Sequence, residues 1–223
     1  MFRRLRDRST AKELPAEPVS RLFGLDRGEP LDRRYIEAFL AANAAHIAGD
    51  VLEIGDSGYT KRFGRERVRR SLVLHATPGN DAATIVGDLV TGEGVPDAVC
   101  DCFILTQTLP FVYDVRAAAR NAVRAVRPGG HLLVTTPGIT QVSRYDMDRW
   151  GHFWSFTELS LRRLFEEVVP KDEVTVETHG NVKVAAAFLY GLPQDALSEA
   201  DWTRTDPDYP VVLTARVRRP PPA

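Results

Sequence analysis

The chain has few cysteines and almost no net charge. Cys100 and Cys102 are the only cysteines among 223 residues. Two such residues cannot build a disulfide framework or a zinc site, and we interpret them as small core hydrophobes. The 29 Lys and Arg residues are balanced by 30 Asp and Glu residues. This balance argues against a dedicated nucleic-acid-binding protein.

Long hydrophobic runs are also absent. The N-terminus is basic from Arg3 to Arg8, but no apolar segment follows it that would make a signal peptide or span a bilayer. We therefore expect a cytoplasmic protein with no membrane partner, and we interpret residues 1–20 as a loose, solvated tail. No cluster of Asp, Glu and His has a spacing that requires a divalent cation, so we expect no metal.

Hydrophobic periodicity predicts an α/β fold. Apolar residues recur at helical spacing over 32–47, with Asp32 as the expected N-cap and the helix ending near Gly49. Strands and helices then alternate, which favours a mostly parallel, doubly wound sheet. The expected strands are 51–55, 71–76, 84–87, 101–106, 130–136, 173–179 and 210–217, and the expected helices lie near 59–66, 114–126, 157–168 and 193–199.

Three motifs suggest a ligand site at one edge of this sheet. Residues 51–58 read Val-Leu-Glu-Ile-Gly-Asp-Ser-Gly, an apolar run that ends in a glycine turn. Residues 83–89 end a second apolar run in Gly87-Asp88-Leu89, and residues 126–134 form a Pro-Gly-Gly turn entering a strand. Glycine allows backbone to come close to a ligand, and ligands of open α/β sheets bind outside the carboxyl ends of the strands.

In this order, the three motifs resemble those of the class I S-adenosylmethionine-dependent methyltransferases. The resemblance covers roughly residues 50–217 and implies a Rossmann-like, doubly wound, seven-stranded, mostly parallel sheet with an antiparallel last strand beside the sixth. It divides the chain into an N-terminal arm and lid helix (1–49), a methyltransferase domain (50–217) and a disordered tail (218–223). It implies S-adenosylmethionine as cofactor and S-adenosylhomocysteine as product. The cofactor-binding residues that we expect are Glu53, Gly55, Asp56, Gly58, Tyr59, His75, Asp88, Leu89, Gln107 and Thr108.

Several of these roles have alternatives. The second strand ends in His75, where the family usually has an acid for the ribose hydroxyls, so Asp56 and Asn80 are further candidates. Asp88 matches the position that binds the adenine amino group, although aspartate is also a common helix N-cap. Gln107 and Thr108 either bind the methionine amine or cap the strand end.

Two segments are candidate walls of an acceptor pocket. Residues 20–35 combine aromatics, arginines and glycines as a lid would, with Arg27, Arg33 and Tyr35 as expected contacts, or they dock as an ordinary helix. Residues 141–157 are rich in aromatic side chains suited to sugars or rings, among them Tyr145, Trp150 and Trp154. These side chains could instead anchor the loop, and we expect at least one of the aromatics to do so. The second segment resembles, more distantly, that of bacterial methyltransferases of sugar and natural-product modification.

Methyl transfer to a hydroxyl needs a base, and His152 is our first choice, followed by Asp146 and Asp148. The first hypothesis is thus an O-methyltransferase acting on a small-molecule or glycan hydroxyl. A second is an N- or C-methyltransferase of another metabolite, which needs no alcohol base. A third is a non-catalytic module that binds S-adenosylmethionine. The sequence does not identify the acceptor or the oligomeric state.

Overall fold

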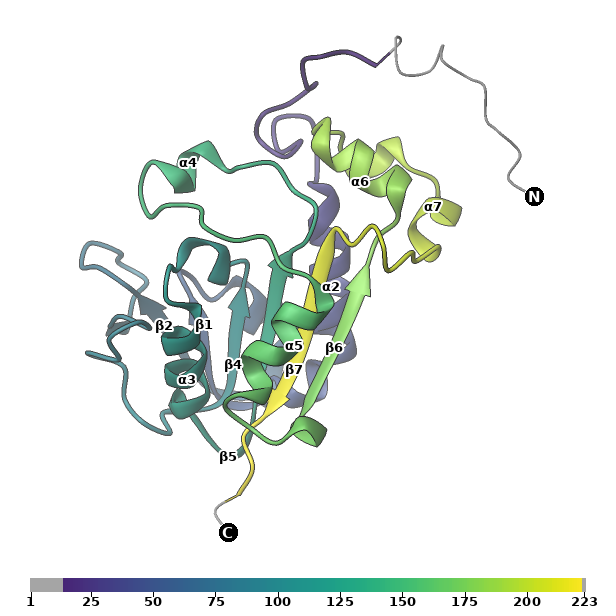
Figure 1. Ribbon diagram of the computed structural model, residues 1–223. Coiled ribbons are helices and arrows are strands. Elements are labelled where there is room, and N and C mark those ends of the chain that lie inside the picture. Colours follow the sequence, from purple (N-terminus) through teal and green to yellow (C-terminus); the bar gives the residue numbers. More distant parts are fainter. Residues whose placement is uncertain (1–13, 222–223) are drawn as a thin grey trace.

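A seven-stranded sheet forms the centre of the protein in the computed structural model, which describes residues 14–221 (Figure 1). Its strand order is β3-β2-β1-β4-β5-β7-β6. The strands are β1 (Gly49–Ile54), β2 (Val68–His75), β3 (Ile85–Val86), β4 (Cys100–Thr106), β5 (Val126–Pro137), β6 (Val174–His179) and β7 (Val212–Arg218).

Strand direction agrees with the doubly wound fold expected from the sequence. The strands from β3 to β5 pair in parallel, whereas β7 lies antiparallel between β5 and β6. Strand order reverses between β1 and β4, because the chain moves outward from β1 to β3 and then returns to the other side of β1. The carboxyl ends of β1 and β4 therefore flank the place where ligands of such sheets bind.

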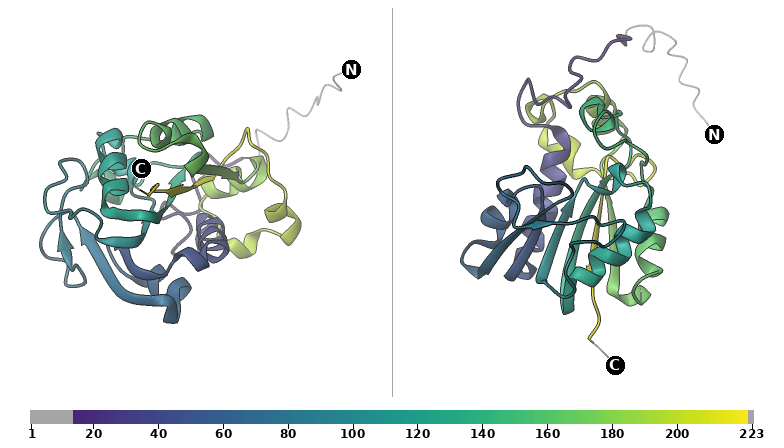
Figure 2. Two further views of the ribbon diagram at one scale, coloured as in Figure 1. Left: turned by 90° about the horizontal axis from the view of Figure 1, so that it is seen from below. Right: turned by 90° about the vertical axis from the view of Figure 1, so that its left-hand side faces the viewer.

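Helices cover both faces of the sheet (Figure 2). On one face, α3 (Val115–Ala125) and α5 (Glu158–Glu166) contribute buried residues such as Ala122 and Phe165 to the larger core cluster. On the other face, α2 (Leu31–Ala42) and α6 (Val182–Leu189) contribute Leu40 and Phe188 to the second cluster. Cys100 and Cys102 are buried and free, as small core side chains.

The helices differ from the sequence prediction at several places. The helix expected over 32–47 ends at Ala42 and is followed by the short helix η1 (Ala44–His46). Asp32 is not its N-cap, because the helix begins at Leu31 after Pro30 and Asp32 lies in the first turn. The other short helices are η2 (Thr60–Gly64), η3 (Arg65–Arg67), η4 (Leu109–Phe111), α4 (Arg144–Met147), η5 (Lys171–Glu173), η6 (Gln194–Ala196) and α7 (Glu199–Thr203).

The N-terminal arm is fastened to the segment after α6. The amides of Val19 and Ser20 donate to the carbonyl oxygen of Tyr190, and Pro30 forms an isolated bridge with Pro193. The arm therefore lies across the carboxyl-end side of the sheet. The basic residues Arg3 to Arg8 fall outside the described residues.

Residues 218 and 219, expected to begin a disordered tail, belong to the fold. Arg218 is the last residue of β7, and the amide of Arg219 donates to the Gly130 carbonyl. The Arg219 guanidinium also binds the carbonyls of Arg124 and Val126, both at 2.7 Å. The backbone bond continues the pairing of β7 with β5, while residues 222–223 lie outside the described part.

Residues 14–221 contain neither a candidate membrane span nor a cluster of three candidate metal ligands. None of the helices there is long and apolar enough to cross a bilayer. Within the same residues, His, Cys, Asp and Glu side chains do not gather in threes as metal ligands do.

Candidate active site

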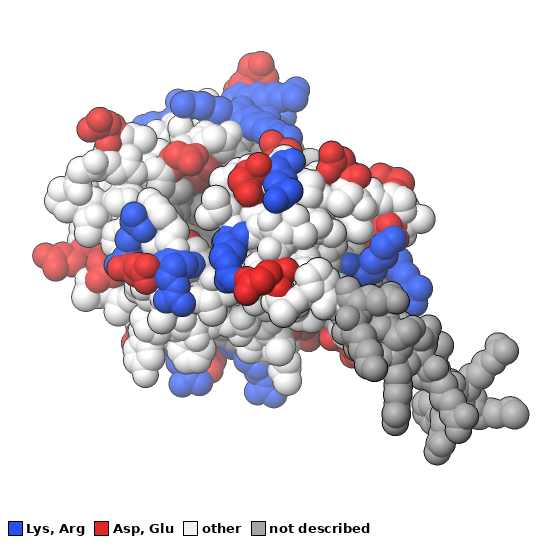
Figure 3. Space-filling view, turned by 90° about the horizontal axis from the view of Figure 1, so that it is seen from above, with Lys and Arg blue, Asp and Glu red and all other residues white. Residues whose placement is uncertain are grey.

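Two adjoining cavities open at the carboxyl ends of the strands. The larger chamber has a volume of about 670 Å³ and the smaller chamber about 330 Å³, both within the usual range for ligand pockets. Gln107, Phe111 and Asp146 line both, so these residues mark the junction. Seen from this end, the molecule carries interspersed acidic and basic side chains rather than a continuous patch of one sign (Figure 3).

The glycine turn after β1 forms part of the larger chamber. Gly55 has φ +80°, and a Cβ placed on it would meet nothing within 4 Å, so the turn leaves open space at the chamber wall. The Asn80 side chain donates to the Gly55 carbonyl at 2.6 Å and holds the turn from outside the chamber. Asp56 accepts a hydrogen bond from the Gly58 amide at 2.6 Å. Asp56 and Gly58 do not line either chamber.

Glu53 supports this turn from within the protein. Its buried carboxylate accepts bonds from the amides of Tyr59 and Thr60 and from the Thr60 hydroxyl, at 3.1, 2.8 and 2.7 Å. Burial raises the pKa of the Glu53 carboxyl, and the bonds from Thr60 and Tyr59 oppose that rise. Glu53 and Tyr59 do not line either chamber, so their geometry is that of residues that position the turn.

Asp88 and Leu89 line the far part of the larger chamber. The Asp88 Oδ1 atom accepts a bond from the Val90 amide at 2.7 Å, which stabilises a turn; no helix of the described chain begins here. The helix N-cap alternative for Asp88 is therefore wrong. Its second carboxylate oxygen remains for a hydrogen-bond donor on a ligand.

His75 is the ribose candidate that reaches the larger chamber. Its Nδ1 atom lies 2.8 Å from the Thr77 carbonyl oxygen, which can only accept, and 3.4 Å from the Thr77 amide; the shorter contact favours the tautomer with the proton on Nδ1. In that tautomer Nε2 is a hydrogen-bond acceptor, as a ribose hydroxyl requires. The edge of Trp150 packs against the imidazole, with ring centroids 6.1 Å apart, and Trp150 also lines this chamber.

Gln107 occupies the junction in an unusual conformation. Its φ of +47° is rare for a residue with a side chain, and such strain is concentrated at functional sites. The backbone amide donates to the Thr135 carbonyl, but the buried Nε2 atom of the side chain has no partner in the described protein. Thr108 instead donates its hydroxyl to the Thr106 carbonyl at 2.9 Å, so it caps the strand end while lining the larger chamber.

The N-terminal arm forms one wall of the smaller chamber. Leu22, Phe23 and Leu25 contribute apolar surface, and Asp32 and Arg33 from the start of α2 contribute charge. Of the expected lid contacts, Arg33 therefore lines a chamber.

Tyr35 and Arg27 do not line either chamber. Tyr35 is buried in the second core cluster, stacked on His179 and against the edge of Trp202, because it lies on the inward face of α2. Arg27 is exposed, and its Nε atom donates to the Val19 carbonyl within the arm.

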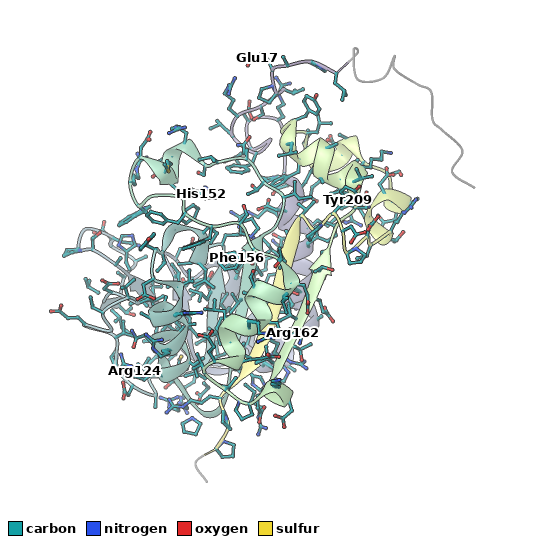
Figure 4. The ribbon with its side chains drawn as sticks, viewed as in Figure 1. Glu17, Arg124, His152, Phe156, Arg162 and Tyr209 are labelled. Carbon is teal, nitrogen blue, oxygen red and sulfur yellow. The ribbon has the colours of Figure 1, made fainter. Side chains whose placement is uncertain are left out.

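The loop after β5 supplies the polar wall of the smaller chamber. Ser143 caps α4: its hydroxyl contacts the Asp146 carboxylate, and its amide donates to Nδ1 of His152 at 3.1 Å. Asp146 and His152 both line this chamber, and Figure 4 shows His152 between the α4 loop and the sheet. Burial lowers the pKa of His152, and the nearby Asp146 charge opposes this shift.

The remaining candidates of this loop lie outside the chambers. Asp148 is exposed and pairs with Arg144 at 3.6 Å, while Tyr145 is exposed under the Arg149 guanidinium. Trp154 donates its Nε1–H to the Val112 carbonyl at 3.0 Å. Phe156 is buried in the core and is the aromatic that anchors the loop.

Sequence reasoning missed several residues of the site. Phe111 follows β4 in a Leu-Pro-Phe helical turn, and the Pro at its start was the available signal. Tyr113 and Phe153 line the larger chamber from two different loops and contact each other, with ring centroids 5.3 Å apart. No local pattern joins two such loops, so only the fold brings them together.

The residues present fit S-adenosylmethionine. The larger chamber combines the open glycine turn, a carboxylate at Asp88, an acceptor nitrogen at His75 and the unpartnered amide of Gln107. These groups match an adenosine at one end and a charged amino-acid group at the other.

Comparisons with known proteins agree with this site. Residues 38–134 match the family model described as methyltransferase domain. The N-methyltransferase NodS from Bradyrhizobium japonicum, solved with S-adenosylhomocysteine, has TM-score 0.53 and 17% identity, with 87% of this chain and 90% of that chain covered. A methyltransferase from Archaeoglobus fulgidus has TM-score 0.54 and 12% identity over 83% and 93% of the two chains. At these low sequence identities, the similarity shows that the proteins share a fold and does not show a shared activity.

A curated relative is the malonyl-[acyl-carrier protein] O-methyltransferase of Serratia marcescens, 30% identical over 136 residues. The match covers 56% of this chain, and the chain spans about half (53%) of that relative's length. Residues 38–134 therefore resemble a methyltransferase domain, and the strand order and the motifs around the larger chamber agree with the fold of the class I S-adenosylmethionine-dependent methyltransferases.

Proposed function

We propose that the protein transfers a methyl group to a hydroxyl of a small-molecule acceptor held in the smaller chamber. The observation that carries this proposal is Asp146, a carboxylate at the junction of the two chambers. S-Adenosylmethionine, when bound in the larger chamber, supplies an electrophilic methyl group. Gln107 and Phe111 also line the junction and would align the acceptor with that group, and alignment alone lowers the barrier of such a displacement substantially.

Asp146 is a better base than His152 in this arrangement. The lone pair of His152 Nδ1 accepts the Ser143 amide, so the ring proton is on Nε2 and the imidazole can only donate toward the chamber. One Asp146 oxygen accepts from the Ser143 hydroxyl, and the other remains for the acceptor proton. We assign the base to Asp146 and a hydrogen bond to the acceptor to His152 Nε2–H.

The cofactor roles follow from the same geometry. Asp88 would accept a bond from the adenine amino group, His75 Nε2 would accept one from a ribose hydroxyl, and Gln107 would bind the methionine end. Thr108 and Leu89 would contact the cofactor from the strand ends. Glu53, Asn80 and Tyr59 would act indirectly by holding the turn around Gly55.

The acceptor class is also a proposal. The smaller chamber favours a compact molecule over an extended glycan, and the aromatic ring of Phe111 at the junction suits a sugar ring in a natural-product metabolite. The printed activity of the curated relative, O-methylation, favours oxygen over nitrogen or carbon. The proposal places the reaction in the cytoplasm.

Product analysis tests this function. Purified protein is incubated with S-adenosylmethionine carrying a deuterated methyl group and with a panel of hydroxy, amino and enol compounds. We expect deuterated methyl ethers, located by fragment mass spectrometry. Label on nitrogen or carbon would favour the second hypothesis, and cofactor binding without turnover on any class would favour a non-catalytic module.

A further inference from the structure

The opening of the smaller chamber carries exposed apolar side chains. Leu22 and Leu25 of the N-terminal arm line this chamber, yet they are 58% and 68% exposed. Val142 of the loop after β5 is 54% exposed, and its neighbour Gln141 donates its side-chain Nε2 to the Arg21 carbonyl at 2.9 Å, which joins the loop to the arm. We refer to Leu22, Leu25 and Val142 as the mouth surface, where the apolar lining of the chamber continues onto the outside of the protein.

The conformation of the arm directs these leucines outward. The Ser20 hydroxyl oxygen accepts a hydrogen bond from the Leu22 amide at 3.0 Å. Phe23 has a φ of +58°, which is strained for a residue with a side chain, and its ring packs on Phe188 with ring centroids 5.7 Å apart. Because Phe23 turns inward, Leu22 and Leu25, which precede and follow it, remain at the surface. Local strain at one residue thus packs an aromatic ring against α6 and leaves two leucines exposed.

Exposed hydrophobic side chains concentrate at this end of the protein. Single exposed leucines are ordinary, whereas a group of them beside a ligand chamber indicates a binding surface. Within residues 14–221, most of the large hydrophobic side chains that are exposed lie in two segments, 14–25 and 142–154. Figure 1 shows the arm and the α4 loop at the same end of the sheet. The mouth surface is therefore the part of a wider apolar region that adjoins the smaller chamber.

The formal charges of this region cancel. Residues 14–27 and 141–155 carry four arginines and four acidic residues, namely Arg21, Arg27, Arg144 and Arg149, and Glu17, Asp26, Asp146 and Asp148. Among them, Arg21 pairs with Glu17, and Arg144 pairs with Asp148 at 3.6 Å. This end of the molecule shows no continuous patch of one sign (Figure 3). An acidic protein or an anionic lipid surface would find no excess of positive charge here, so the region favours an uncharged apolar ligand.

We propose that the acceptor is amphipathic, with a compact hydroxylated head in the smaller chamber and an apolar tail that crosses the mouth surface. This inference rests on the proposed function, which places the reacting hydroxyl beside Asp146, and it adds the class of molecule that carries the hydroxyl. The chamber, with a volume of about 330 Å³, holds the head, while Leu22, Leu25 and Val142 contact the part of the tail that lies outside. These contacts favour binding because they remove hydrocarbon surface from water.

Calorimetry with two series of probes tests the tail. The full-length protein, with S-adenosylhomocysteine in excess, is titrated with butyl and octyl glucoside and with butane-1,2-diol and octane-1,2-diol, all below the concentrations at which micelles form. The chain-length gain is the ratio of the dissociation constants of the shorter and the longer member of a series. Burial of one methylene raises an affinity roughly fourfold, so the longer chain should give a gain of at least about tenfold even when it is only partly buried.

The test variant combines Leu22→Ser with Leu25→Ser, and Leu159→Ser is the matched control. Leu159 is 59% exposed on α5, which covers the other face of the sheet from α2, and it lines neither chamber. We expect the chain-length gain to fall to about twofold or less in the double variant and to stay at about tenfold or more in Leu159→Ser. The affinity for S-adenosylhomocysteine should be unchanged in both variants, which also shows that they are folded.

A gain in either series that is lost in the double variant supports the proposal. A gain that is equal in the wild type and the double variant would overturn it, as would a wild-type gain below about twofold in both series. Wild-type protein that dimerises, or that co-sediments with phosphatidylcholine vesicles, without any chain-length gain would assign the mouth surface to a second copy or to a membrane instead. Failure of the proposed function gives a different result, namely labelled methyl on nitrogen or carbon with the chain-length gain retained.

Discussion

Individual residues of the smaller chamber carry the proposed chemistry. Asp146 and His152 both face the smaller chamber, but the Ser143 amide determines the tautomer of His152. Sequence reasoning could find both residues, because charged and aromatic side chains after the fifth strand are a recognisable pattern. It could not rank them, because the ranking depends on a backbone hydrogen bond within a loop.

Asp146→Asn should lower the turnover number by about a hundredfold or more, since loss of a general base has this effect. The asparagine keeps the size of the side chain and its hydrogen bond to Ser143, so S-adenosylhomocysteine affinity should change little. Steady-state kinetics and calorimetry give the two values.

Asp148→Asn serves as the matched control for Asp146→Asn. Asp148 lies in the same loop but is exposed and paired with Arg144. The turnover number of Asp148→Asn should therefore stay near that of the wild type. Equal activity in Asp146→Asn and wild type would remove Asp146 as the base.

Gly55→Val should weaken S-adenosylhomocysteine binding by at least tenfold. The φ of +80° strains any side chain, and the open space beside Gly55 is the space that the cofactor needs. Calorimetry measures the affinity and circular dichroism checks the fold. A folded variant with wild-type affinity would show that the cofactor does not pass this turn.

At the scale of elements, the sequence predicted the sheet more accurately than the helices. Apolar runs in β1, β2, β4 and β5 reveal the central parallel strands, because buried parallel strands need continuous apolar side chains. The alternating burial of β6 and the two residues of β3 are weaker signals, although both lie within expected strands. The sequence prediction lacked α6, whose residues Val-Lys-Val-Ala-Ala-Ala-Phe-Leu give little amphipathic contrast. Its start is set by Asn181, whose side chain accepts bonds from the amides of Lys183 and Val184. That signal is easily missed within a long connection.

The N-terminal arm and α2 should respond differently to truncation. Deleting residues 1–29 removes the chamber wall formed by Leu22, Phe23 and Leu25 but keeps α2. The turnover number should therefore fall strongly, while the melting temperature should change little. Deleting residues 1–35 also removes Leu31 and Tyr35, which are 0% and 8% exposed. Each such side chain contributes about 1.5–3 kcal/mol, so this deletion should unfold the protein at a much lower temperature.

Thermal unfolding and turnover of the two truncated proteins give the comparison. Full activity after deletion of residues 1–29 would show that the arm is not part of the acceptor chamber. Equal melting temperatures of the two truncated proteins would contradict the role of α2 in the core.

For the molecule as a whole, the end of the sheet opposite the chambers makes stability depend on pH. His46 and His131 stack there with ring centroids 3.9 Å apart. Burial lowers the pKa of both, that of His131 to about 4 from an ordinary value near 6.5. The unfolded chain therefore binds more protons than the folded one between these values, and the free energy of unfolding should fall as pH drops from 6.5 toward 4.

His131→Phe should reduce this loss, because phenylalanine keeps the ring stack and does not titrate. Urea unfolding at several pH values between 7 and 4 measures the slope in both proteins. A slope that is identical in the variant would show that His131 does not contribute to the acid sensitivity.

A crystal structure of the protein with S-adenosylhomocysteine tests the central claim most directly, namely that the two chambers are a cofactor site and an acceptor site joined at Asp146. We expect the adenine beside Asp88, the ribose beside His75 Nε2 and the sulfur at the junction facing Asp146. A complex with the nucleoside in the smaller chamber, or with the sulfur directed away from Asp146, would contradict this account.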